Sequence, residues 1–535
     1  MSPDKSVATA FRRRGPATRR RLPQSSQHGL LPVPPDDQEK YSYARRHVWV
    51  LTVLSLLCFS SLAVSQFRFS SSSPWFWIFA PFLTLITLDY LISLRLDSFT
   101  RDFDLRAHRK LVRGWKPAAY PDVDVFLPVA GEPIEVLHNT WGHVRRLTAQ
   151  YPGTARPYVL DDSASPQIAA MAQEFGFAYV VRPDRGRFKK AGNLNHALAR
   201  TGGEYILILD ADFAPRADLL EELLPYLTDD PKVAIAQSPQ YFRILDQQNW
   251  IERGAGSVQE LFYRSVQVSR QRSGGAICVG SCAVYRRSAL AEVGGITLID
   301  HSEDIYTGFD LASRGYNLEY VPVPLSTGVC PDTVASFQNQ QYRWCAGSLS
   351  LTTSRRFWRT DLTFNTRLCF ISGFLHYVQT AMFTLLAPLI PIFLLLLRPD
   401  LLRAEQTAWL LPSILYTAVA LPLWHRNPYR LEAWAVRLMY GWAHVFAIWD
   451  QLRGREIGWK PTGSAGARQN QATRRFWIGM ICWCVPTAVL WVGGALYQLL
   501  THYPPDFALA LSGGLFYACV VGRVLVQPRA QEVTA

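Results

Sequence analysis

Long apolar runs on either side of a polar middle section most restrict how this chain of 535 residues can fold. A helix needs about 20 mostly apolar residues to cross a bilayer. No run of that length occurs between residues 97 and 358. Six runs with few or no charged residues lie outside that section: 47–66, 74–94, 375–397, 407–424, 476–499 and, more weakly, 507–526. The sequence therefore predicts a polar domain between two N-terminal and four C-terminal membrane spans.

The positive charge of the chain is concentrated beside these runs. A net charge of +13 would also suit a protein that binds nucleic acid. Residues 1–30, however, hold seven Lys and Arg against one Asp, and residues 425–475 are also basic. Basic segments next to spans favour the cytoplasmic face and its anionic lipids. We therefore expect a multi-pass plasma-membrane protein in contact with the lipid bilayer, no nucleic-acid partner, and a cytoplasmic location for the polar domain and both termini.

Short β-rich runs alternate with helical patterns in the polar domain. The β-rich runs are residues 123–129, 158–160, 179–181, 205–209 and 233–236. The helical patterns include residues 166–176, 192–200 and 216–227. This alternation predicts a parallel α/β sheet, whose ligands bind at the carboxyl ends of the strands.

Two acidic pairs follow predicted strands: Asp161 with Asp162, and Asp210 with Asp212. Side chains at i and i+2 of a strand face the same way, so we expect Asp210 and Asp212 to converge on one cation. Carboxylate oxygens suit Mg2+ or Mn2+ that bridges a diphosphate. An isolated Asp-x-Asp is more often a pair of solvated loop carboxylates, and only the apolar run before Asp210 favours a site.

Two further clusters have a plain interpretation beside the functional one. Lys190 and Gly192 stand at the start of a predicted helix, where they suit phosphate contact or simply form a basic helix start. Ser302, Glu303 and Asp304 follow the turn at residues 279–281. A carboxylate in that position suits a general base, but an N-cap serine followed by first-turn acids explains the pattern equally well.

The segment Gln340-Gln341-Tyr342-Arg343-Trp344 precedes the third apolar run. Arg343 can form paired hydrogen bonds with phosphate oxygens, and Trp344 can stack on a sugar ring and hold an acceptor in line. A tryptophan in an amphipathic helix is more often part of interfacial packing, so Trp344 decides nothing by itself.

Taken in order, these motifs resemble those of the processive, membrane-embedded glycosyltransferases of family two, in particular the cellulose synthase and cellulose-synthase-like branch. The resemblance covers roughly residues 120–360. It implies an α/β, GT-A-like catalytic domain inserted in an α-helical bundle of about six transmembrane helices plus amphipathic interface helices. It also implies inverting transfer of a sugar, with glucose favoured, from a UDP-sugar to the non-reducing end of a growing polysaccharide. The product would be a β-1,4 or mixed β-1,3/1,4-glucan that is moved across the membrane.

The resemblance implies a role for each motif residue. Asp304, with Glu303 beside it, would take the proton of the acceptor hydroxyl, and Asp210 and Asp212 would hold Mg2+ or Mn2+. The nucleotide sugar would be bound by Asp161, Asp162, Lys190, Gln340 and Arg343. The acceptor would be bound by Trp344, Gly280 and Ser281.

Three departures from the family pattern stand out. Ser302 replaces the usual threonine. The stretch 459–463 replaces the gating sequence of bacterial cellulose synthases, and we hypothesise that its Lys460 and Thr462 close over bound UDP. Unchanged rates and UDP affinity in Lys460→Ala and Thr462→Ala would remove that hypothesis. The chain also stops soon after the last predicted span, so regulation through an appended cyclic-di-GMP-binding domain would need another protein.

These observations divide the chain into seven parts. The segment 429–453 is aromatic-rich but charged, which favours a helix in the membrane interface over a seventh span. The parts are a basic disordered tail (1–45), a transmembrane hairpin (46–96), the catalytic domain (97–335), interface helices (336–374), spans three and four (375–424), an interface helix with a gating-type loop (425–474), and spans five and six with a short tail (475–535).

Other functions stay open at this stage. A non-processive transferase with a lipid acceptor, or a chitin- or hyaluronan-type synthase, shares the acidic motifs. An inactive membrane scaffold or transporter would require broken acidic sites, and none is broken. Residues 340–344 and the following Gly347 favour polymerisation, and the stretch from Cys330 to Gly347 resembles glucan synthases.

Overall fold

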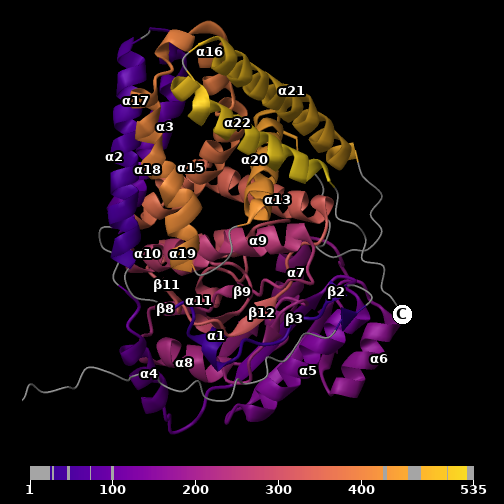
Figure 1. The fold of residues 1–535 in the computed structure, drawn as a ribbon. Helices are drawn as coiled ribbons and strands as arrows, with labels where there is room; N and C mark the ends of the chain where they lie inside the picture. The colour runs from indigo at the N-terminus through magenta and orange to yellow at the C-terminus, as the bar shows by residue number, and fades with distance from the viewer. Residues whose placement is uncertain are drawn as a thin grey trace, which may run out of the picture.

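The structure is a computed structural model that describes residues 25–26, 29–44, 48–72, 74–97, 102–425, 430–455, 471–502 and 504–526. Figure 1 shows a bundle of long helices above an α/β domain. The bundle consists of α2 (Val48–Ser72), α3 (Ala80–Asp97), α15 (Phe364–Leu386), α16 (Leu389–Leu397), α17 (Ala404–Thr407), α18 (Leu411–Leu415), α19 (Leu421–His425), α20 (Leu431–Leu452), α21 (Gln471–Thr501) and α22 (Pro504–Leu525).

Six stretches of the described chain are long and apolar enough to cross a membrane, which confirms the predicted number and order of spans. They are Trp49–Ser72, Trp77–Leu96, Phe364–Leu397, Ala404–Trp424, Thr473–Thr501 and Pro504–Leu525. The third consists of α15 and α16, separated at Pro388, which has no N–H to continue the helical hydrogen bonds. The charged segment 429–453 forms α20, which packs against α9 (Trp250–Leu261), α13 (Val334–Thr352), α15 and α22. Its position in the membrane interface stays a prediction.

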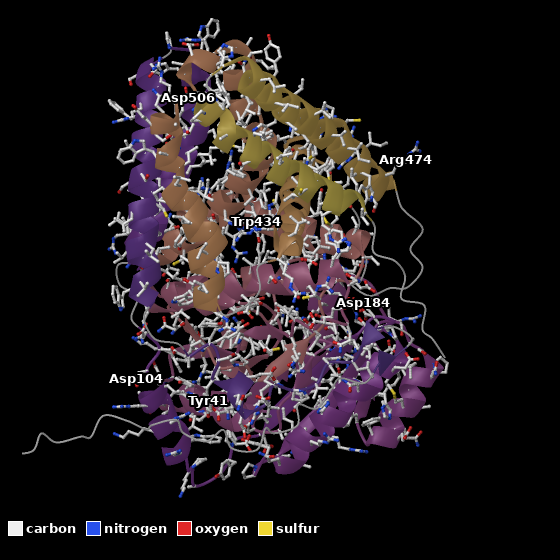
Figure 2. The ribbon with its side chains drawn as sticks, in the orientation of Figure 1. Tyr41, Asp104, Asp184, Trp434, Arg474 and Asp506 are labelled. Carbon is white, nitrogen blue, oxygen red and sulfur yellow. The ribbon has the colours of Figure 1, made fainter. Side chains whose placement is uncertain are left out.

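Three contacts place separate parts of the chain against the domain, at one end of the bundle. They are Lys40 with Asp218 at 2.7 Å, Arg253 with Glu432 at 2.9 Å, and Arg523 at 5.0 Å from the ring centre of Trp250. An even number of spans separates each of these segments from the domain, as a membrane arrangement requires. Figure 2 shows Tyr41 at the domain end and Asp506, in the first turn of α22, at the opposite end.

The domain contains a seven-stranded sheet with the order β11-β8-β10-β6-β3-β4-β5. Its strands are β3 (Val123–Val129), β4 (Ala155–Asp161), β5 (Ala178–Val180), β6 (Tyr205–Ile208), β8 (Val233–Gln237), β10 (Ala283–Arg286) and β11 (Asn317–Tyr320). A three-stranded sheet is formed by β7 (Ala214–Pro215), β12 (Ser326–Gly328) and β9 (Gln240–Phe242). The helices not yet named are α1 (Asp37–Lys40), α4 (Leu105–Gly114), α5 (Ile134–Gln150), α6 (Pro166–Phe175), α7 (Lys189–Leu198), α8 (Leu219–Asp229), α10 (Gln267–Arg272), α11 (Arg287–Glu292), α12 (Glu303–Ser313) and α14 (Arg355–Arg359).

The central strands are buried on both faces, because successive side chains point to opposite sides of the sheet. In β3, Val125 and Leu127 join the larger apolar cluster, whereas Phe126 joins the smaller one. In β6, Leu207 and Ile208 divide between the two clusters in the same way. This arrangement explains why both strands are continuous apolar runs in the sequence.

All five β-rich runs form strands, but the expectation of a purely parallel sheet is wrong. β10 lies antiparallel between β6 and β8, with Ala283 opposite both Ile208 and Gln237. Gly280 and Cys282, at φ +73° and +56°, turn the chain immediately before this strand. The four residues of β10 carry no signal of strand direction in themselves, so the sequence could not predict the reversal.

The expected disorder of residues 1–45 is also wrong for residues 30–44, which dock on the domain. Asp36 and Glu39 form a capping box at the start of α1, and Glu39 accepts a hydrogen bond from Arg243 at 2.9 Å. Lys40 is 5% exposed and also forms an ion pair with Glu222. The preceding carbonyls at positions 32, 34 and 35 accept hydrogen bonds from Asn139, Arg243 and Arg216. Prolines at those positions favour the extended backbone that presents these carbonyls to the domain.

Candidate active site

Acidic side chains from three adjacent strands gather at one edge of the sheet. β3 lies between β4 and β6 and is parallel to both, with Val129 opposite Asp161. Glu132, which the sequence analysis missed, follows β3 by three residues. Burial raises the pKa of Glu132, and the charges of Asp210 and Asp161 raise it further. An acidic residue just after the apolar run 123–129 was the signal that could have identified it.

Asp161 is fully buried beneath the loop that follows β4. Its carboxylate accepts hydrogen bonds from the backbone N–H and hydroxyl of Ser163 at 2.7 and 2.6 Å, from the N–H of Ser165 at 3.0 Å and from the hydroxyl of Tyr179 at 2.8 Å. The structure therefore shows Asp161 supporting the loop, and its contact with the nucleotide stays a prediction.

Asp162 is held by Arg182, a second residue that the sequence analysis missed. The Nε and Nη2 atoms of Arg182 donate to the two carboxylate oxygens of Asp162, each at 2.6 Å. Arg182 also donates to the carbonyls of Arg187 and Lys189 at 2.6 and 3.0 Å. A Cβ at Gly192 would overlap the guanidinium, so this glycine leaves space for Arg182. Arg182 thus joins the end of β4 to the start of α7.

Asp210 and Asp212 are brought together by a turn. β6 ends at Ile208, and the N–H of Phe213 donates to the carbonyl of Asp210 at 3.1 Å. The expectation that strand alternation aligns the two carboxylates is therefore wrong, although the pair does meet. Burial and the charge of Asp210 raise the pKa of Asp212 to about 7.

Lys190 lies between this pair and the loop before β10. Its Nζ donates to Asp210 Oδ1 at 2.5 Å and to the carbonyl of Gly280 at 2.9 Å. Burial acts to lower the pKa of Lys190, but the surrounding carboxylates, Asp210 first, raise it above its usual value. Ser281 is fully buried, and its hydroxyl accepts a hydrogen bond from the N–H of Asp210 at 2.9 Å. Ser281 therefore supports the backbone of Asp210, and its predicted role in binding the acceptor stays a prediction.

Asp304 lies in the first turn of α12, close to Lys190. Burial raises the pKa of Asp304 to about 7, with a further increase from the charge of Glu303. The N–H of Ile305, which donates to Oδ1 at 2.8 Å, and the charge of Lys190 act in the opposite direction. Ser302 is the N-cap residue of α12, and Glu303 and Asp304 lie in its first turn, as the alternative interpretation has it, but the Ser302 side chain makes no capping hydrogen bond. A carboxylate with a pKa near neutrality is suited to general base chemistry.

The segment 340–344 lies within α13. Gln340, Arg343 and Trp344 are half-buried, while Tyr342 and Cys345 belong to an apolar cluster with Ala447 of α20. Burial lowers the pKa of Arg343, and the nearby charges of Glu303, Asp304 and Asp210 oppose this shift. The helix therefore holds a cation beside both acidic groups and anchors its opposite face on the bundle.

Tyr342 joins α13 to the ends of α20 and α21. Its hydroxyl donates to Asp450 Oδ2 at 3.2 Å, and Arg475 donates to both oxygens of Asp450 at 2.9 and 2.5 Å. Asp450 is 1% exposed, whereas the side chain of Arg475 is 37% exposed, so water reaches this ion pair from the Arg475 side. Lys460 and Thr462, which were predicted to close over UDP, lie outside the residues that the structure describes.

The carboxylates of Asp210 and Asp212 are suitable ligands for a divalent cation that binds together with a diphosphate. Among the described residues, no three His, Cys, Asp or Glu side chains are grouped as a metal site. Mg2+ is commonly held by one or two carboxylates together with substrate phosphates, and Asp210 and Asp212 supply such a pair. The ammonium of Lys190 lies on Oδ1 of Asp210, so a metal ion held here would share this carboxylate with Lys190.

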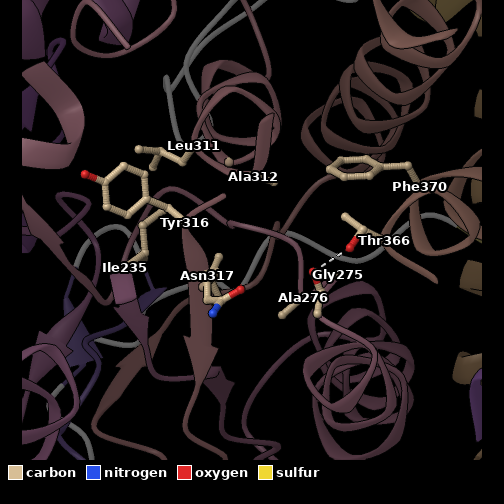
Figure 3. Close-up of a pocket in the computed structure, with 12 residues that line it drawn as sticks. Ile235, Gly275, Ala276, Leu311, Ala312, Tyr316, Asn317, Thr366 and Phe370 are labelled. Carbon is tan, nitrogen blue, oxygen red and sulfur yellow. Dashed lines mark hydrogen bonds between the residues drawn. The ribbon is translucent and has the colours of Figure 1, made fainter. Parts of the chain in front are cut away.

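The small pocket in Figure 3 is separate from these residues. It lies at the C-terminal end of α12, near Leu311 and Ala312, whereas Asp304 lies at the N-terminal end. Thr366 Oγ1 donates to the carbonyl of Gly274 at 3.0 Å along its border. No predicted site residue lines it, so we place the candidate site at the sheet edge.

Solved structures and curated proteins resemble parts of this chain. The structure of the mannosyltransferase PcManGT from Pyrobaculum calidifontis in complex with GDP-Man and Mn2+ aligns with a TM-score of 0.42 at 18% identity, over 70% of this chain and all of that one. Cellulose synthase 1 of Komagataeibacter xylinus is 32% identical over 267 residues, which cover 49% of this chain and 17% of the relative. The UDP-forming cellulose synthase catalytic subunit of Xanthomonas axonopodis pv. citri is 32% identical over 263 residues, which cover 48% of this chain and 36% of the relative.

This chain thus spans well under half the length of these two curated relatives. Residues 205–397 match the family model for glycosyl transferase family group 2. That segment runs from β6 through α12 and α13 to the end of α16, and so includes Asp210, Asp304 and Arg343. The likeness to glycosyl transferase family group 2 is therefore limited to this segment, which holds most of the candidate site.

Proposed function

We propose that this protein transfers glucose from UDP-glucose to the non-reducing end of a growing β-glucan, with β-1,4 or mixed β-1,3/1,4 linkage. The observation that carries this proposal is the convergence of Lys190, Asp210, Asp304 and Arg343 at the sheet edge, beside a helix that packs on the membrane bundle. The similarity to cellulose synthase catalytic subunits that are named as UDP-forming supports the same donor.

The diphosphate of the donor would lie between α7 and α13. Lys190 and Arg343 provide two cations for its oxygens, and Gln340 adds an amide one helical turn before Arg343. Asp210 and Asp212 would hold Mg2+ or Mn2+, which when bound neutralises charge on the departing diphosphate. Asp161 and Asp162 shape the loop beside the nucleoside, through the hydrogen bonds with Ser163 and Arg182.

Asp304 would act as the general base. Its carboxylate takes the proton of the acceptor hydroxyl while that oxygen bonds to C1 of the glucose. The bond between C1 and the phosphate oxygen breaks, and UDP leaves with the electron pair. Attack from the opposite face inverts the α-linked donor to a β-linked product. Trp344, two helical positions from the Tyr342 anchor, would hold the terminal sugar by stacking.

The polymer would leave through the bundle, with the domain and both termini in the cytoplasm. Support comes from rings that adjoin α13: Tyr377 contacts His444 edge to face at 4.9 Å, and Tyr440 stacks on His444 at 5.2 Å. Tyr377 also packs on the cluster that contains Tyr342. Aromatic rings bind sugars without fixing one position along the chain, as translocation requires; His444 itself is buried, so Tyr377 and Tyr440 would supply the exposed faces.

The test is to incubate the purified full chain in lipid nanodiscs with individual labelled UDP-sugars and Mg2+ or Mn2+. We expect incorporation from UDP-glucose into a polymer that is degraded by enzymes specific for β-1,4 or mixed-linkage glucan. Asp304→Asn should abolish UDP release without loss of folding. A single sugar on a product extractable into organic solvent would instead indicate a lipid acceptor. Incorporation from UDP-N-acetylglucosamine alone would indicate a chitin- or hyaluronan-type synthase, and no turnover would indicate a scaffold or transporter.

A further inference from the structure

Gly347 occupies an interior position of α13, where glycine is less favourable than alanine. It follows Arg343 by four residues and Trp344 by three, so it lies on the same face of the helix. A Cβ added at Gly347 would lie within 3.0 Å of both Oγ and Cβ of Ser302. The three nearest atoms all belong to Ser302, so the space that this glycine leaves is filled by one side chain.

Ser302 has an unusual backbone conformation for a residue with a side chain. Its φ and ψ are 62° and 31°, in the left-handed region that favours glycine. It immediately precedes α12, and its hydroxyl lies 3.4 Å from the carbonyl oxygen of Arg343, to which it donates. Ser302 thus rests on α13 at the start of the helix that carries the proposed base.

Asp304 is confined from the other side by Gly280. A Cβ at Gly280 would lie 3.0 Å from both Cβ and Oδ2 of Asp304. The carbonyl of Gly280 is held by Lys190 at 2.9 Å. The base therefore lies between a loop tied to Lys190 and a helix start seated on α13.

Further along, α12 remains joined to the same helix. The hydroxyls of Tyr306 and Ser350 lie 2.9 Å apart, and Asp310 forms an ion pair with Arg356 of α14. Only the contact at Ser302, however, lies beside the carboxylate of Asp304. A displacement at Ser302 would therefore move the base relative to Arg343 and Trp344.

We propose that Gly347 is a positioning residue for this base. By leaving space for Ser302, it sets the distance between the Asp304 carboxylate and the face of α13 that would hold the diphosphate and the terminal sugar. This inference rests on the proposed function. A displacement of about 1 Å in a reacting group can reduce a rate about 100-fold, so a single methyl group at Gly347 is a severe test.

The experiment compares three variants of the full chain in nanodiscs. Gly347→Ala adds the overlapping methyl group. The double variant Ser302→Gly with Gly347→Ala removes the side chain that it meets and places glycine at the left-handed backbone position. Gly142→Ala is the matched control, because it adds a Cβ in helix α5 that meets nothing within 4 Å apart from its chain neighbours and the backbone of its own helix. For each protein, kcat, KM for UDP-glucose, UDP affinity and the melting temperature are measured.

We expect Gly347→Ala to lower kcat about 10- to 100-fold, with KM and UDP affinity within about threefold of the wild type. The double variant should recover most of kcat, and Gly142→Ala should match the wild type. Wild-type kcat in Gly347→Ala, or no recovery in the double variant, would overturn the inference. A wild-type protein that turns over no UDP-sugar would instead contradict the proposed function. In that case the melting temperatures still test the inference. It requires that Gly347→Ala lower the melting temperature and that adding Ser302→Gly restore it.

Discussion

Replacement of Glu303 by Gln should make the protein relatively more active in acid. The base must be deprotonated to accept a proton, so activity is lost as the pH falls through the pKa of Asp304. That pKa is raised from 3.8 to about 7, by burial first and then by the charge of Glu303. Glu303→Gln removes that charge and should lower the pKa of Asp304. The effect of the raised Asp304 pKa on folding stability runs opposite to its effect on activity. Protonated Asp304 stabilises the folded protein at low pH, and this stabilisation is lost as the pH rises through about 7.

The size of the effect follows from the titration curve. With a pKa near 7, about a tenth of Asp304 is ionised at pH 6 and about nine tenths at pH 8. A neighbouring like charge contributes on the order of one pH unit, so about half would be ionised at pH 6 in Glu303→Gln. The ratio of kcat at pH 6 to kcat at pH 8 should therefore rise about fivefold. Lys190→Gln should lower this ratio, because Lys190 acts to lower the pKa of Asp304.

The assay is release of UDP from saturating UDP-glucose, quantified by chromatography across pH 5 to about 9. The ratio within each variant cancels any general loss of activity. Asp212 also has a pKa raised to about 7, but the charges that raise it are those of Asp210 and Glu132, so the response to Glu303→Gln reports Asp304. An unchanged ratio, or a shift in the same direction for both variants, would refute the assignment of Asp304 as the base.

Three further results are expected. Arg182→Gln should reduce the free energy of unfolding by about 3 to 5 kcal/mol in denaturant titrations, because it breaks a buried ion pair, whereas Arg156→Gln at an exposed pair should cost less than about 1 kcal/mol. Ser281→Ala should weaken Mn2+-dependent UDP binding about tenfold in calorimetry, since the N–H that it supports loses its acceptor; equal affinity would show that this hydroxyl does not support the site. Lys40→Met should expose residues 30–44 to limited proteolysis, whereas the 90% exposed Asp37 should tolerate Asn with no change in cleavage.

The positions of the acidic groups were the most predictable part of the site. An apolar run followed by Asp210 indicates a buried strand with a carboxylate just after it, and β6 ends at Ile208, two residues before Asp210. The contacts that hold these groups were not predictable, because they join residues far apart in the chain. Asp161 bonds with Tyr179, and Asp210 bonds with Ser281, 71 residues later. Pattern analysis identifies which residues lie at a strand end and not which side chain lies beneath them.

In the fold, too, features with a local sequence signal were predictable, and features that depend on distant residues were not. Apolar runs of span length, and strand runs such as Val123–Val129, carry their own signal and were predicted closely. The direction of β10 depends on the turn at Gly280 and Cys282, whose positive φ values have no signature in a residue such as cysteine. Docking of residues 30–44 depends on charges supplied by distant helices, which local composition does not record.

The docked N-terminal segment also constrains the order in which the molecule is assembled. The partners of Lys40 follow it by 178 and 182 residues. Glu260, which accepts a hydrogen bond from Tyr43, follows Tyr43 by 217 residues. At cellular synthesis rates, on the order of 10 to 40 s pass before these partners emerge, and both helices of the first hairpin are complete by then. If only one of these two helices crossed the bilayer, Lys40 would lie on the opposite side of the membrane from Asp218 and Glu222. The buried lysine thus makes completion of the domain depend on correct insertion of the first two spans.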